Sequence, residues 1–395
     1  MMLKEQIRRL ASKYAGEMIE IRRYLHANPE LSEKEDNTSA YLREKLAGWG
    51  IPFKANVGGF GIIAEIRGQN PESRTIALRA DMDALPVNEI NDVAYKSCNE
   101  GVMHACGHDV HMSCLLGAAR ILHEVKEQFE GTLRLIFQPS EEKFPGGALA
   151  MIREGVLENP RPVQILGLHV LPTLEAGKAG FRSGRYMAST DEIYLTVKGK
   201  GGHAATPDLN IDTVLIASHI VVALQQVVSR CAPPGIPTVL SFGRFIADGR
   251  TNIIPGEVKI DGTIRTFDEA WRSRAHEKIT TLAQGIARSM GGECEVFIDK
   301  GYPYLVNDEE LTSRSKQLAI EYLGAGNVVE TEQRMTAEDF AYYSHIIPAC
   351  FYRLGVKNPE WKEVRNLHTP EFDADEKSIE VGMGLIAWLA VGSGS

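Results

Sequence analysis

The chain has 395 residues, of which 44% are hydrophobic and 24% charged, so it is long enough for two folded domains. Its 52 acidic and 43 basic residues give a net charge of −9, which argues against nucleic acid or an anionic membrane surface as a partner. No apolar run approaches the ~20 residues of a membrane span, and the charged start is unlike a signal peptide. The six scattered cysteines lack the spacing of a disulfide framework, so we expect a cytoplasmic protein.

The first 184 residues alternate between predicted helices and strands. A helix is expected over residues 3–25, where apolar residues recur at helical spacing until Asn28-Pro29 breaks the pattern, and a second over 37–49. Strands are predicted at 61–66, 75–78, 133–137 and 163–168, and further helices at 111–125 and 148–154. This alternation predicts an α/β fold with a mostly parallel central sheet flanked by helices.

The pattern changes at Arg185. The following elements are expected in the order strand, helix, strand, strand, helix, strand, at residues 193–197, 211–229, 239–245, 258–264, 269–290 and 294–298. That order is typical of a ferredoxin-like α+β domain. The larger pattern then resumes with a helix at 309–322, a strand at 350–354 and a helix at 377–391. We therefore expect a large domain formed by 1–184 and 300–391, an inserted domain over 185–299, and a flexible tail over 392–395.

Acidic and imidazole side chains follow three predicted strands of the large domain. Asp81-Met82-Asp83, Glu141-Glu142 and His169 each come directly after an apolar run. Because ligands bind beyond the carboxyl ends of strands in open α/β sheets, we expect these side chains to converge. Taken singly, His169 or His368 is more often a structural residue, and adjacent acids are usually a solvated turn.

The densest group of candidate ligands lies between His104 and His111. Three histidines and Cys106 fall within these eight residues, which is hard to attribute to surface chance. Cysteine, histidine and carboxylate form the ligand set of zinc and related divalent metals. Spacing alone does not choose among His104, Cys106, His108 and His111. Asp109 lies at a predicted helix start, where it also suits a capping role.

Five motifs occur in an order that resembles one known family. They are Asp81-Met82-Asp83-Ala84-Leu85-Pro86, Met103-His104-Ala105-Cys106-Gly107-His108-Asp109, Pro139-Ser140-Glu141-Glu142, Gly167-Leu168-His169 and Leu367-His368-Thr369-Pro370. They resemble the dinuclear metallo-amidohydrolases of the aminoacylase and carboxypeptidase G clan. The branch is that of hippurate hydrolase, indole-acetyl-amino-acid hydrolases and bacterial N-acyl-amino-acid amidohydrolases. The resemblance covers essentially the whole chain, including residues 201–205 and 251–255, which match that family's lid or dimerisation domain.

The resemblance implies roles for individual residues. Cys106 matches the ligand that bridges two divalent ions (Zn, Mn, Co or Ni), Glu141 the general base and Asp83 a carboxylate behind the ligands. The remaining metal ligands are matched by His108, Glu142, His169 and His368. The groups of the lid domain that hold the substrate are matched by His203, Asn252 and Arg265. In the family, the histidine matched by His203 comes from the second subunit. The resemblance therefore implies a homodimer formed through the lid domain.

The activity implied by the resemblance is hydrolysis of the amide bond of N-acyl-L-amino acids by a metal-activated water. Hippurate-like, acetyl- or indole-acetyl-type conjugates, or short peptides, would be the small-molecule partners. A dipeptidase, a carboxypeptidase and a deacylase of a biosynthetic intermediate are alternatives within the clan. A cysteine hydrolase using Cys106 is a further alternative, but it leaves Glu142, His169 and His368 without a role. A non-catalytic module that binds an amino acid or a metal is the third class.

Overall fold

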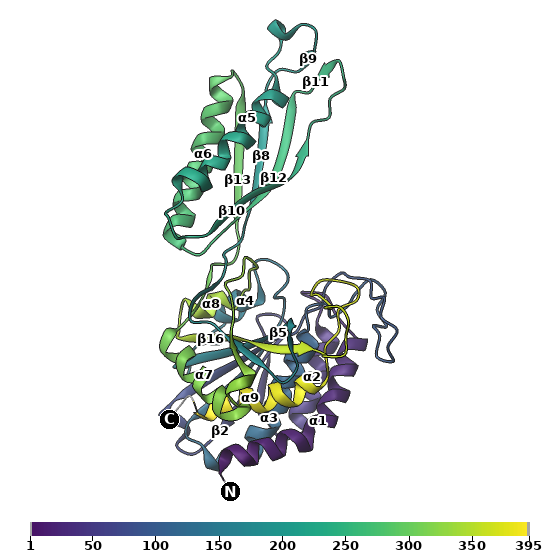
Figure 1. Ribbon diagram of the computed structural model, residues 1–395, viewed down its shortest axis with the longest axis vertical. Helices are drawn as coiled ribbons and strands as arrows, with labels where there is room; N and C mark the ends of the chain where they lie inside the picture. The colour runs from purple at the N-terminus through teal and green to yellow at the C-terminus, as the bar shows by residue number, and fades with distance from the viewer. Residues whose placement is uncertain (1, 393–395) are drawn as a thin grey trace. The chain divides into compact units, whose positions relative to one another are not determined.

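The computed structural model describes residues 2–392, and the chain divides into two compact units (Figure 1). Unit 1 comprises Met1–Gly184, Val306–Gln333 and Asp339–Ser395, and unit 2 comprises Arg185–Leu305 and Arg334–Glu338. Unit 1 is therefore assembled from both ends of the chain, and unit 2 is inserted into it. The tail expected at the C-terminus lies, beyond residue 392, outside the described residues.

Unit 1 is organised around a sheet that has eight strands within the described residues, in the order β1-β2-β4-β3-β5-β16-β6-β15. The strands are β1 (Phe53–Val57), β2 (Gly61–Arg67), β3 (Thr75–Asp81), β4 (Thr132–Gln138), β5 (Gln164–Glu175), β6 (Ala179–Phe181), β15 (Val328–Glu330) and β16 (Ala349–Lys357). The central strands β4, β3, β5 and β16 run parallel, and antiparallel neighbours flank them. The mostly parallel α/β sheet predicted from the sequence is confirmed.

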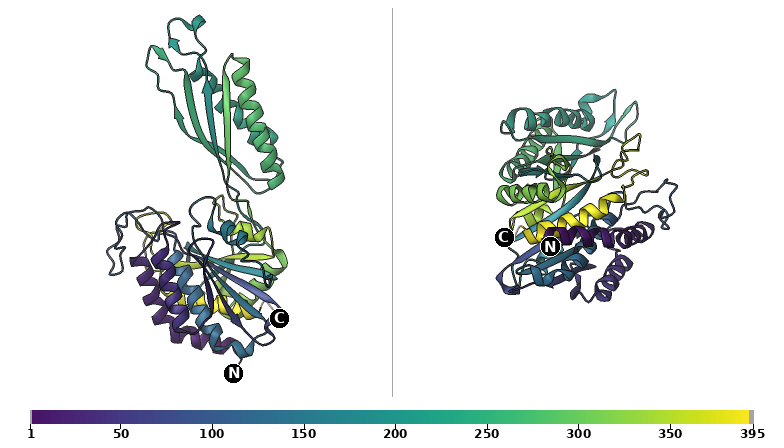
Figure 2. Two further views of the ribbon diagram at one scale, coloured as in Figure 1. Left: turned by 180° about the vertical axis from the view of Figure 1, so that it is seen from behind. Right: turned by 60° about the horizontal axis from the view of Figure 1, so that its bottom comes forward.

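Helices cover both faces of this sheet. The helices α1, α3 and α9 pack together on one side, and the short helices α4 and α8 lie on the other (Figures 1 and 2). The helices of unit 1 are α1 (Leu3–Ala27), α2 (Asp36–Gly48), α3 (His108–Glu124), α4 (Gly147–Arg153), α7 (Glu309–Leu323), α8 (Ala341–Ser344) and α9 (Lys377–Gly392). The arrangement is a three-layer α/β sandwich.

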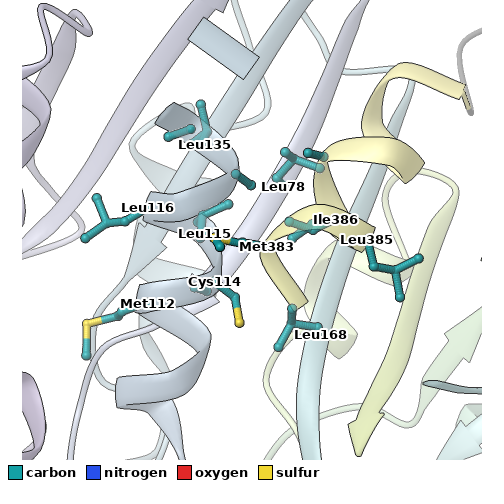
Figure 3. Packing of buried hydrophobic residues seen from close by; sticks show 14 of the residues in the cluster. Leu78, Met112, Cys114, Leu115, Leu116, Leu135, Leu168, Met383, Leu385 and Ile386 are labelled. Atoms are coloured by element: carbon teal, nitrogen blue, oxygen red, sulfur yellow. The ribbon is translucent and has the colours of Figure 1, made fainter. Parts of the chain in front are cut away.

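Helix α3 is the centre of the packing in unit 1. It is buried along nearly its whole length because α1, α9 and the sheet surround it. Figure 3 shows Leu115 of α3, Met383 and Ile386 of α9 and Leu78 of β3 within one packed cluster. Residues 114–119 of α3 are all apolar, as expected for a helix segment that is buried on all sides. The tight packing holds the first residue of α3, His108, in a fixed place.

Unit 2 has, among the described residues, a four-stranded antiparallel sheet with the order β10-β12-β8-β13. Two helices, α5 and α6, cover one face of it (Figure 1). The elements follow as β8 (Asp191–Lys198), α5 (Thr213–Gln226), β10 (Thr238–Ile246), β12 (Glu257–Thr266), α6 (Glu269–Ser289) and β13 (Glu293–Lys300). Unit 2 also contains the strand pair β9 (Gly202–His203) with β11 (Ile253–Ile254). A further pair, β7 (Gly184–Met187) with β14 (Leu305–Asn307), lies where the chain passes from one unit to the other. The succession of elements in the main sheet is the ferredoxin-like one.

Some elements differ from the sequence expectation. Strand β1 was not predicted, because its five residues alternate in exposure and carry only a short apolar signal. Helix α3 begins at His108, three residues earlier than expected. Strand β5 continues to Glu175, so His169 lies inside a strand rather than at its end. His169 still lies beyond the pairing with β3, whose last partner in β5 is Gly167.

One helix corrects the expectation about apolar runs. Thr213–Cys231 is long and apolar enough to cross a membrane by length and composition, with a mean hydropathy of 1.5 over 18 residues. Core helices pass the same test, and this one buries Ile216, Ile220 and Leu224 in the hydrophobic cluster of unit 2. Leu215 and Val222 of the same helix are exposed, so packing within the domain accounts for one face of the helix only.

Candidate metal centre

Four segments of unit 1 bring five potential metal ligands together around Cys106. The Sγ atom of Cys106 lies 3.4 Å from His169 Nε2 and 3.3 Å from His368 Nε2. The Oε1 atom of Glu142 lies 3.2 Å from His368 Nε2 and 4.0 Å from His108 Nε2. The ligand atoms of Cys106, His108 and His169 all lie within 4.8 Å of one another, and so do those of Cys106, Glu142 and His368. The cysteine is thus shared by two triplets of donors.

Two buried polar atoms of this cluster have no hydrogen-bond partner in the described part of the chain: His108 Nε2 and Glu142 Oε1. An unpaired buried polar group costs about 1–3 kcal/mol, so native proteins rarely keep one without a ligand. Burial, together with the nearby carboxylates of Glu142 and Glu141, raises the pKa of the Cys106 thiol well above its ordinary value. A positive charge between these donors would satisfy all three groups. The thiol, imidazole and carboxylate set fits zinc and related divalent ions.

Hydrogen bonds orient the two buried imidazoles toward the cluster. Nδ1 of His108 donates to the carbonyl oxygen of Asp83 at 2.8 Å, and Nδ1 of His169 donates to that of Val170 at 2.8 Å. In both rings Nε2 is therefore the atom that faces the other donors, as in metal-binding histidines. Burial and the charge of Arg353 lower the pKa of His169 well below its ordinary value, which favours the neutral, ligating form.

His108 carries a different charge balance. Burial opposes a charge on its ring, but the carboxylates of Asp81 and Asp83 outweigh burial and raise the pKa of His108 to about 10. Because a metal ligand must be deprotonated, binding of a metal at His108 would be coupled to the release of a proton.

Two residues beside the cluster, Gly107 and His368, have positive φ values. Gly107 immediately precedes α3 with a φ of 82°, and a Cβ atom there would lie 2.6 Å from Val170 Cγ2. His368 has a φ of 61°, a region that non-glycine residues seldom occupy, and its amide donates to the carbonyl oxygen of Ala105 at 2.8 Å. Such strained positions persist where the surrounding structure fixes them, often at functional sites.

Asp83 lies behind the donors and ties two of their segments together. Its Oδ1 accepts the amide of Glu141 at 3.0 Å, and its Oδ2 accepts the amide of Glu142 at 2.9 Å and the hydroxyl of Ser32 at 2.6 Å. Burial opposes its ionisation, but these hydrogen bonds and His108 outweigh burial and lower the pKa of Asp83. It is therefore a carboxylate that positions the acidic turn.

Glu141 reaches the same cluster without joining either triplet around Cys106. Its carboxylate is buried and lies within 4.8 Å of the ligand atoms of His108 and Glu142. Its Oε1 also lies 3.4 Å from the amide of Asp339. A carboxylate beside a group of metal donors is suited to proton transfer to and from a water.

The structure distinguishes the histidines that spacing left equivalent. His111 donates from Nδ1 to Asp81 at 2.6 Å and accepts the Val170 amide at Nε2 at 2.9 Å, so both of its nitrogens are occupied. His104 is buried, both of its ring nitrogens lack a partner within residues 2–392, and it belongs to none of the donor groups found there. Burial lowers the pKa of His104 to about 4.

Asp109 does not cap helix α3. The N-cap position belongs to Gly107, and Asp109 is buried, where it accepts from Arg22 Nε at 2.7 Å and from His26 Nδ1 at 2.8 Å. These bonds connect α1 to the first turn of α3, beside His108. Because the partners are 83 and 87 residues away, no local sequence pattern indicated them.

The buried ion pairs that Arg79 forms with Asp81 and Asp339 were also not predicted from the sequence. Arg79 is buried within β3 and donates to Asp81 at 2.7 Å and to Asp339 at 2.9 Å. An arginine inside the apolar run of β3 is the one local signal for such a pair, because a buried charge needs a partner. The position of Asp339, 260 residues away, is visible only in the fold.

In unit 2, the three predicted substrate-binding residues occupy two places. His203 on β9 is exposed, and a hydrogen bond of 3.0 Å from the Ala204 amide to the Asn252 carbonyl oxygen places Asn252 next to it. Arg265 is on β12, eight residues after the first residue of that strand, Glu257. At the rise of a strand, eight residues span about 26 Å. Nη1 of Arg265 is buried and has no hydrogen-bond partner among the residues that the structure describes.

The parallel α/β sheet and its buried centre of thiol, imidazole and carboxylate groups define the class of metal-dependent hydrolases. Residues 77–391 match the model of peptidase family M20/M25/M40, and the chain belongs to this family. The family assignment made from the motifs is confirmed, as is the enzyme class, hydrolases acting on amide bonds.

Relatives and a solved structure match over most of their length. The N-acyl-L-amino acid amidohydrolase of Geobacillus stearothermophilus is 41% identical over 309 residues, which cover 78% of this chain and 83% of that protein. Thermostable carboxypeptidase 2 of Saccharolobus solfataricus is 37% identical over 392 residues, 98% of each chain. A crystal structure from Bacillus subtilis, described as a dinuclear metal binding peptidase from the M20 family, has a TM-score of 0.83 and 33% identity. It covers 96% of this chain and 98% of that one.

Proposed function

We propose that this protein hydrolyses the amide bond of N-acyl-L-amino acids. The observation that carries the proposal is the buried pair of donor triplets around Cys106, with Glu141 beside it. The similarity to an N-acyl-L-amino acid amidohydrolase supports the choice of substrate. Hippurate-like, acetyl and indole-acetyl conjugates are the expected substrates, and the cytoplasm is the expected compartment.

Two divalent ions would be held by Cys106 as the shared ligand, with His108 and His169 for one ion and Glu142 and His368 for the other. The similarity to a dinuclear metal binding peptidase supports two ions rather than one. Zn, Mn, Co and Ni all suit this donor set. When bound, such ions supply Lewis-acid chemistry, because they polarise a carbonyl and make a water more acidic.

Glu141 acts as the general base in this proposal. It takes a proton from the attacking water and returns that proton to the nitrogen of the leaving amino acid. Asp83 holds the amides of Glu141 and Glu142, so it keeps both carboxylates in place while the proton moves. The alternative in which Cys106 is the nucleophile leaves Glu142, His169 and His368 without a role, although their ligand atoms converge on this cysteine.

Arg265 and the pair of His203 and Asn252 would bind the substrate from two subunits of a homodimer. Arg265 lies eight residues along β12 from Glu257, about 26 Å at the rise of a strand, whereas His203 is on β9, which pairs with β11. The unpaired, buried Nη1 of Arg265 suits a carboxylate ligand. In the dimer, the partner subunit's His203 would complete each site.

Mixing two inactive variants tests this arrangement. His203→Ala and Arg265→Ala homodimers are each expected to lose activity. A re-equilibrated equal mixture regains about a quarter of the wild-type rate, because half of the dimers then carry one intact site. No regain, or a fully active monomer by light scattering, would contradict the proposed dimer.

Chelation and a product assay test the function itself. Removal of metal by a chelator should abolish release of the free amino acid from hippurate and acetyl-amino acids, and added Mn²⁺ or Zn²⁺ should restore it. Release of amino acid that survives complete demetallation would contradict the proposal.

Carboxypeptidase activity is the second candidate, which the similarity to thermostable carboxypeptidase 2 favours. Faster cleavage of unblocked or longer peptides than of N-acyl-amino acids would select it.

A further inference from the structure

Three consecutive amides of the acidic turn donate to carboxylates from distant parts of unit 1. The amide of Ser140 donates to Glu35 Oε1 at 2.7 Å, and those of Glu141 and Glu142 donate to Asp83 at 3.0 and 2.9 Å. Asp83 belongs to a motif shared with the family, whereas Glu35 lies just before α2 and has no assigned role. The two carboxylates together fix the backbone of the whole turn.

Ser140 has a backbone conformation that needs such support. Its φ is 56°, in the left-handed region that serine seldom occupies. Its hydroxyl donates to Glu35 Oε1 at 3.1 Å and accepts the amide of Glu33 at 2.9 Å. Both the amide and the side chain of Ser140 are thus held by residues 33–35. Without these bonds, relaxation of φ at Ser140 would turn the next side chain, Glu141, in a new direction.

Glu35 is itself held rigidly. Its side chain is fully buried, and its carbonyl oxygen accepts the amide of Ser39 at 2.9 Å in the first turn of α2. The same loop is anchored by Glu30, whose carboxylate accepts the amide and hydroxyl of Thr38 at 2.8 and 2.9 Å. Oε1 of Glu35 accepts both bonds from Ser140, whereas Oε2 is buried and has no hydrogen-bond partner in residues 2–392.

We propose that Glu35 is a positioning residue that sets the direction of the base Glu141 by holding Ser140 in its left-handed conformation. The inference rests on the proposed function, because it assumes that Glu141 moves a proton. In this role Glu35 acts by accepting two hydrogen bonds from Ser140, and its negative charge is not required. Burial and the nearby carboxylate of Asp83 raise the pKa of Glu35 to about 7, which agrees with a group that is not needed as an anion.

Two substitutions of Glu35 test whether this residue acts as a hydrogen-bond acceptor or through its negative charge. Glu35→Ala leaves the Ser140 amide and hydroxyl without an acceptor, so kcat should fall about 100-fold, as misplacement of a catalytic group by about 1 Å does. KM and the bound-metal content should stay within a factor of about two. Glu35→Gln keeps an acceptor oxygen and places its amide where Oε2 had no partner, so it should restore kcat nearly to the wild-type value. The exposed neighbour Glu33→Ala is the control, because its side chain pairs with Lys143 at the surface and its amide, which contacts Ser140, is kept.

Amide hydrogen exchange supplies a readout that does not depend on activity. In the metal-free protein, Glu35→Ala should speed exchange in residues 139–142, whereas Glu35→Gln should leave the exchange as it is in the wild type. If Glu35→Ala does not fold, Ser140→Ala takes its place. It removes both hydrogen bonds of the hydroxyl, to Glu35 and from the Glu33 amide, but keeps the bond from the Ser140 amide to Glu35, so it should give a smaller loss of kcat at unchanged metal content.

Several results would overturn the inference. These are an unchanged kcat in Glu35→Ala despite a lower Tm, a loss of bound metal in that variant, or an equal loss of kcat in Glu35→Gln. In the fallback variant Ser140→Ala, an unchanged kcat would have the same meaning. A failure of the proposed function is distinguishable, because Glu141→Gln would then remain active. If Glu141→Gln is inactive and Glu35→Ala is not impaired, only the role of Glu35 fails.

Discussion

Each unit contains a buried cluster of charged groups, and the two clusters differ in how completely their polar atoms are paired. In unit 2, Asp191 accepts from Arg272 Nε at 2.9 Å, from Arg272 Nη2, from His276 Nε2 at 2.7 Å and from the Gly301 amide at 3.0 Å. Arg272 also donates to Glu269 at 3.0 and 3.1 Å. Both carboxylate oxygens of Asp191 and all three guanidinium nitrogens of Arg272 therefore have partners.

The cluster of unit 1 is incomplete by the same measure. His108 Nε2 and Glu142 Oε1 face one another at 4.0 Å, and within the described residues neither has a hydrogen-bond partner, although Glu142 Oε1 also lies 3.2 Å from His368 Nε2. Both clusters are buried, so burial alone does not separate structural charge from a ligand site. The difference teaches that unpaired polar atoms in a convergent donor set point to a missing ligand, whereas a closed network points to a structural role.

The largest expected effect follows from removing the proposed base of the incomplete cluster. Glu141→Gln keeps the size of the side chain but cannot take a proton, so kcat should fall about 1,000-fold, within the range for general acid–base residues. Bound metal, measured by elemental analysis, should not change, because Glu141 is outside both triplets around Cys106. Glu154→Gln, an exposed residue of the same unit, is the matched control. Retention of a tenth of the wild-type kcat would remove Glu141 from this role.

The closed cluster should respond through stability instead. Asp191→Ala leaves Arg272 buried and partly unpaired, which should lower the free energy of unfolding by about 3–5 kcal/mol. Chemical denaturation, followed by a probe in unit 2, measures this change. The exposed neighbour Glu192→Ala should stay within about 0.5 kcal/mol of the wild type. A loss below about 1 kcal/mol for Asp191→Ala would show that closure of the network is not stabilising.

The incomplete cluster should gain stability only when its ligand is added. Mn²⁺ or Zn²⁺ at 100 times its dissociation constant should stabilise the folded protein by about 2.7 kcal/mol, seen as a higher Tm. Cys106→Ser should lose this gain because it alters the donor shared by both triplets. Cys98→Ser, at an exposed cysteine, is the control and should keep the gain. An equal metal-induced shift in Cys106→Ser would place the metal elsewhere.

The same contrast explains which parts of the site were predictable. Cys106, Glu142 and His368 were named as candidate ligands from motifs, because each short motif contains both the candidate ligand and the residues that set its backbone. The partners Glu35, Arg22 and Arg79 were missed, because their contacts to Ser140, Asp109 and Asp339 span 87 to 260 residues. Hydrogen-bond networks of this kind join residues that are far apart in the sequence. Local hydrophobic periodicity therefore does not predict them.

Most elements of the fold followed from hydrophobic periodicity, and the exceptions have local causes. Strand β1 carries too short a signal, and β5 runs past His169 because the strand continues through Val170 and Leu171 into an exposed end. The separation of Arg265 from His203 could not be predicted, since it depends on the direction in which β12 runs from β11. Residue types were therefore easier to predict than the distances between them.

The smallest expected effect is a pH dependence that belongs to the closed cluster alone. Burial opposes ionisation of Asp191, but hydrogen bonds from Arg272 and His276 outweigh it and hold its pKa below the ordinary value of 3.8. The unfolded chain therefore binds a proton at a higher pH than the folded chain does. The stabilisation is complete above about pH 4 and is lost as the pH falls through the folded pKa, at about 1.4 kcal/mol for each unit of pKa difference.

Denaturation of unit 2 measured from pH 6 down to pH 3 checks this direction. The wild type should lose stability faster than Asp191→Asn, whose amide does not titrate, so the difference between the two proteins should shrink toward low pH. A difference that stays constant would mean that Asp191 has the same pKa in both states. In that case the network around it would act by shape and hydrogen bonding alone, and the closed cluster would differ from the incomplete one in pairing but not in charge.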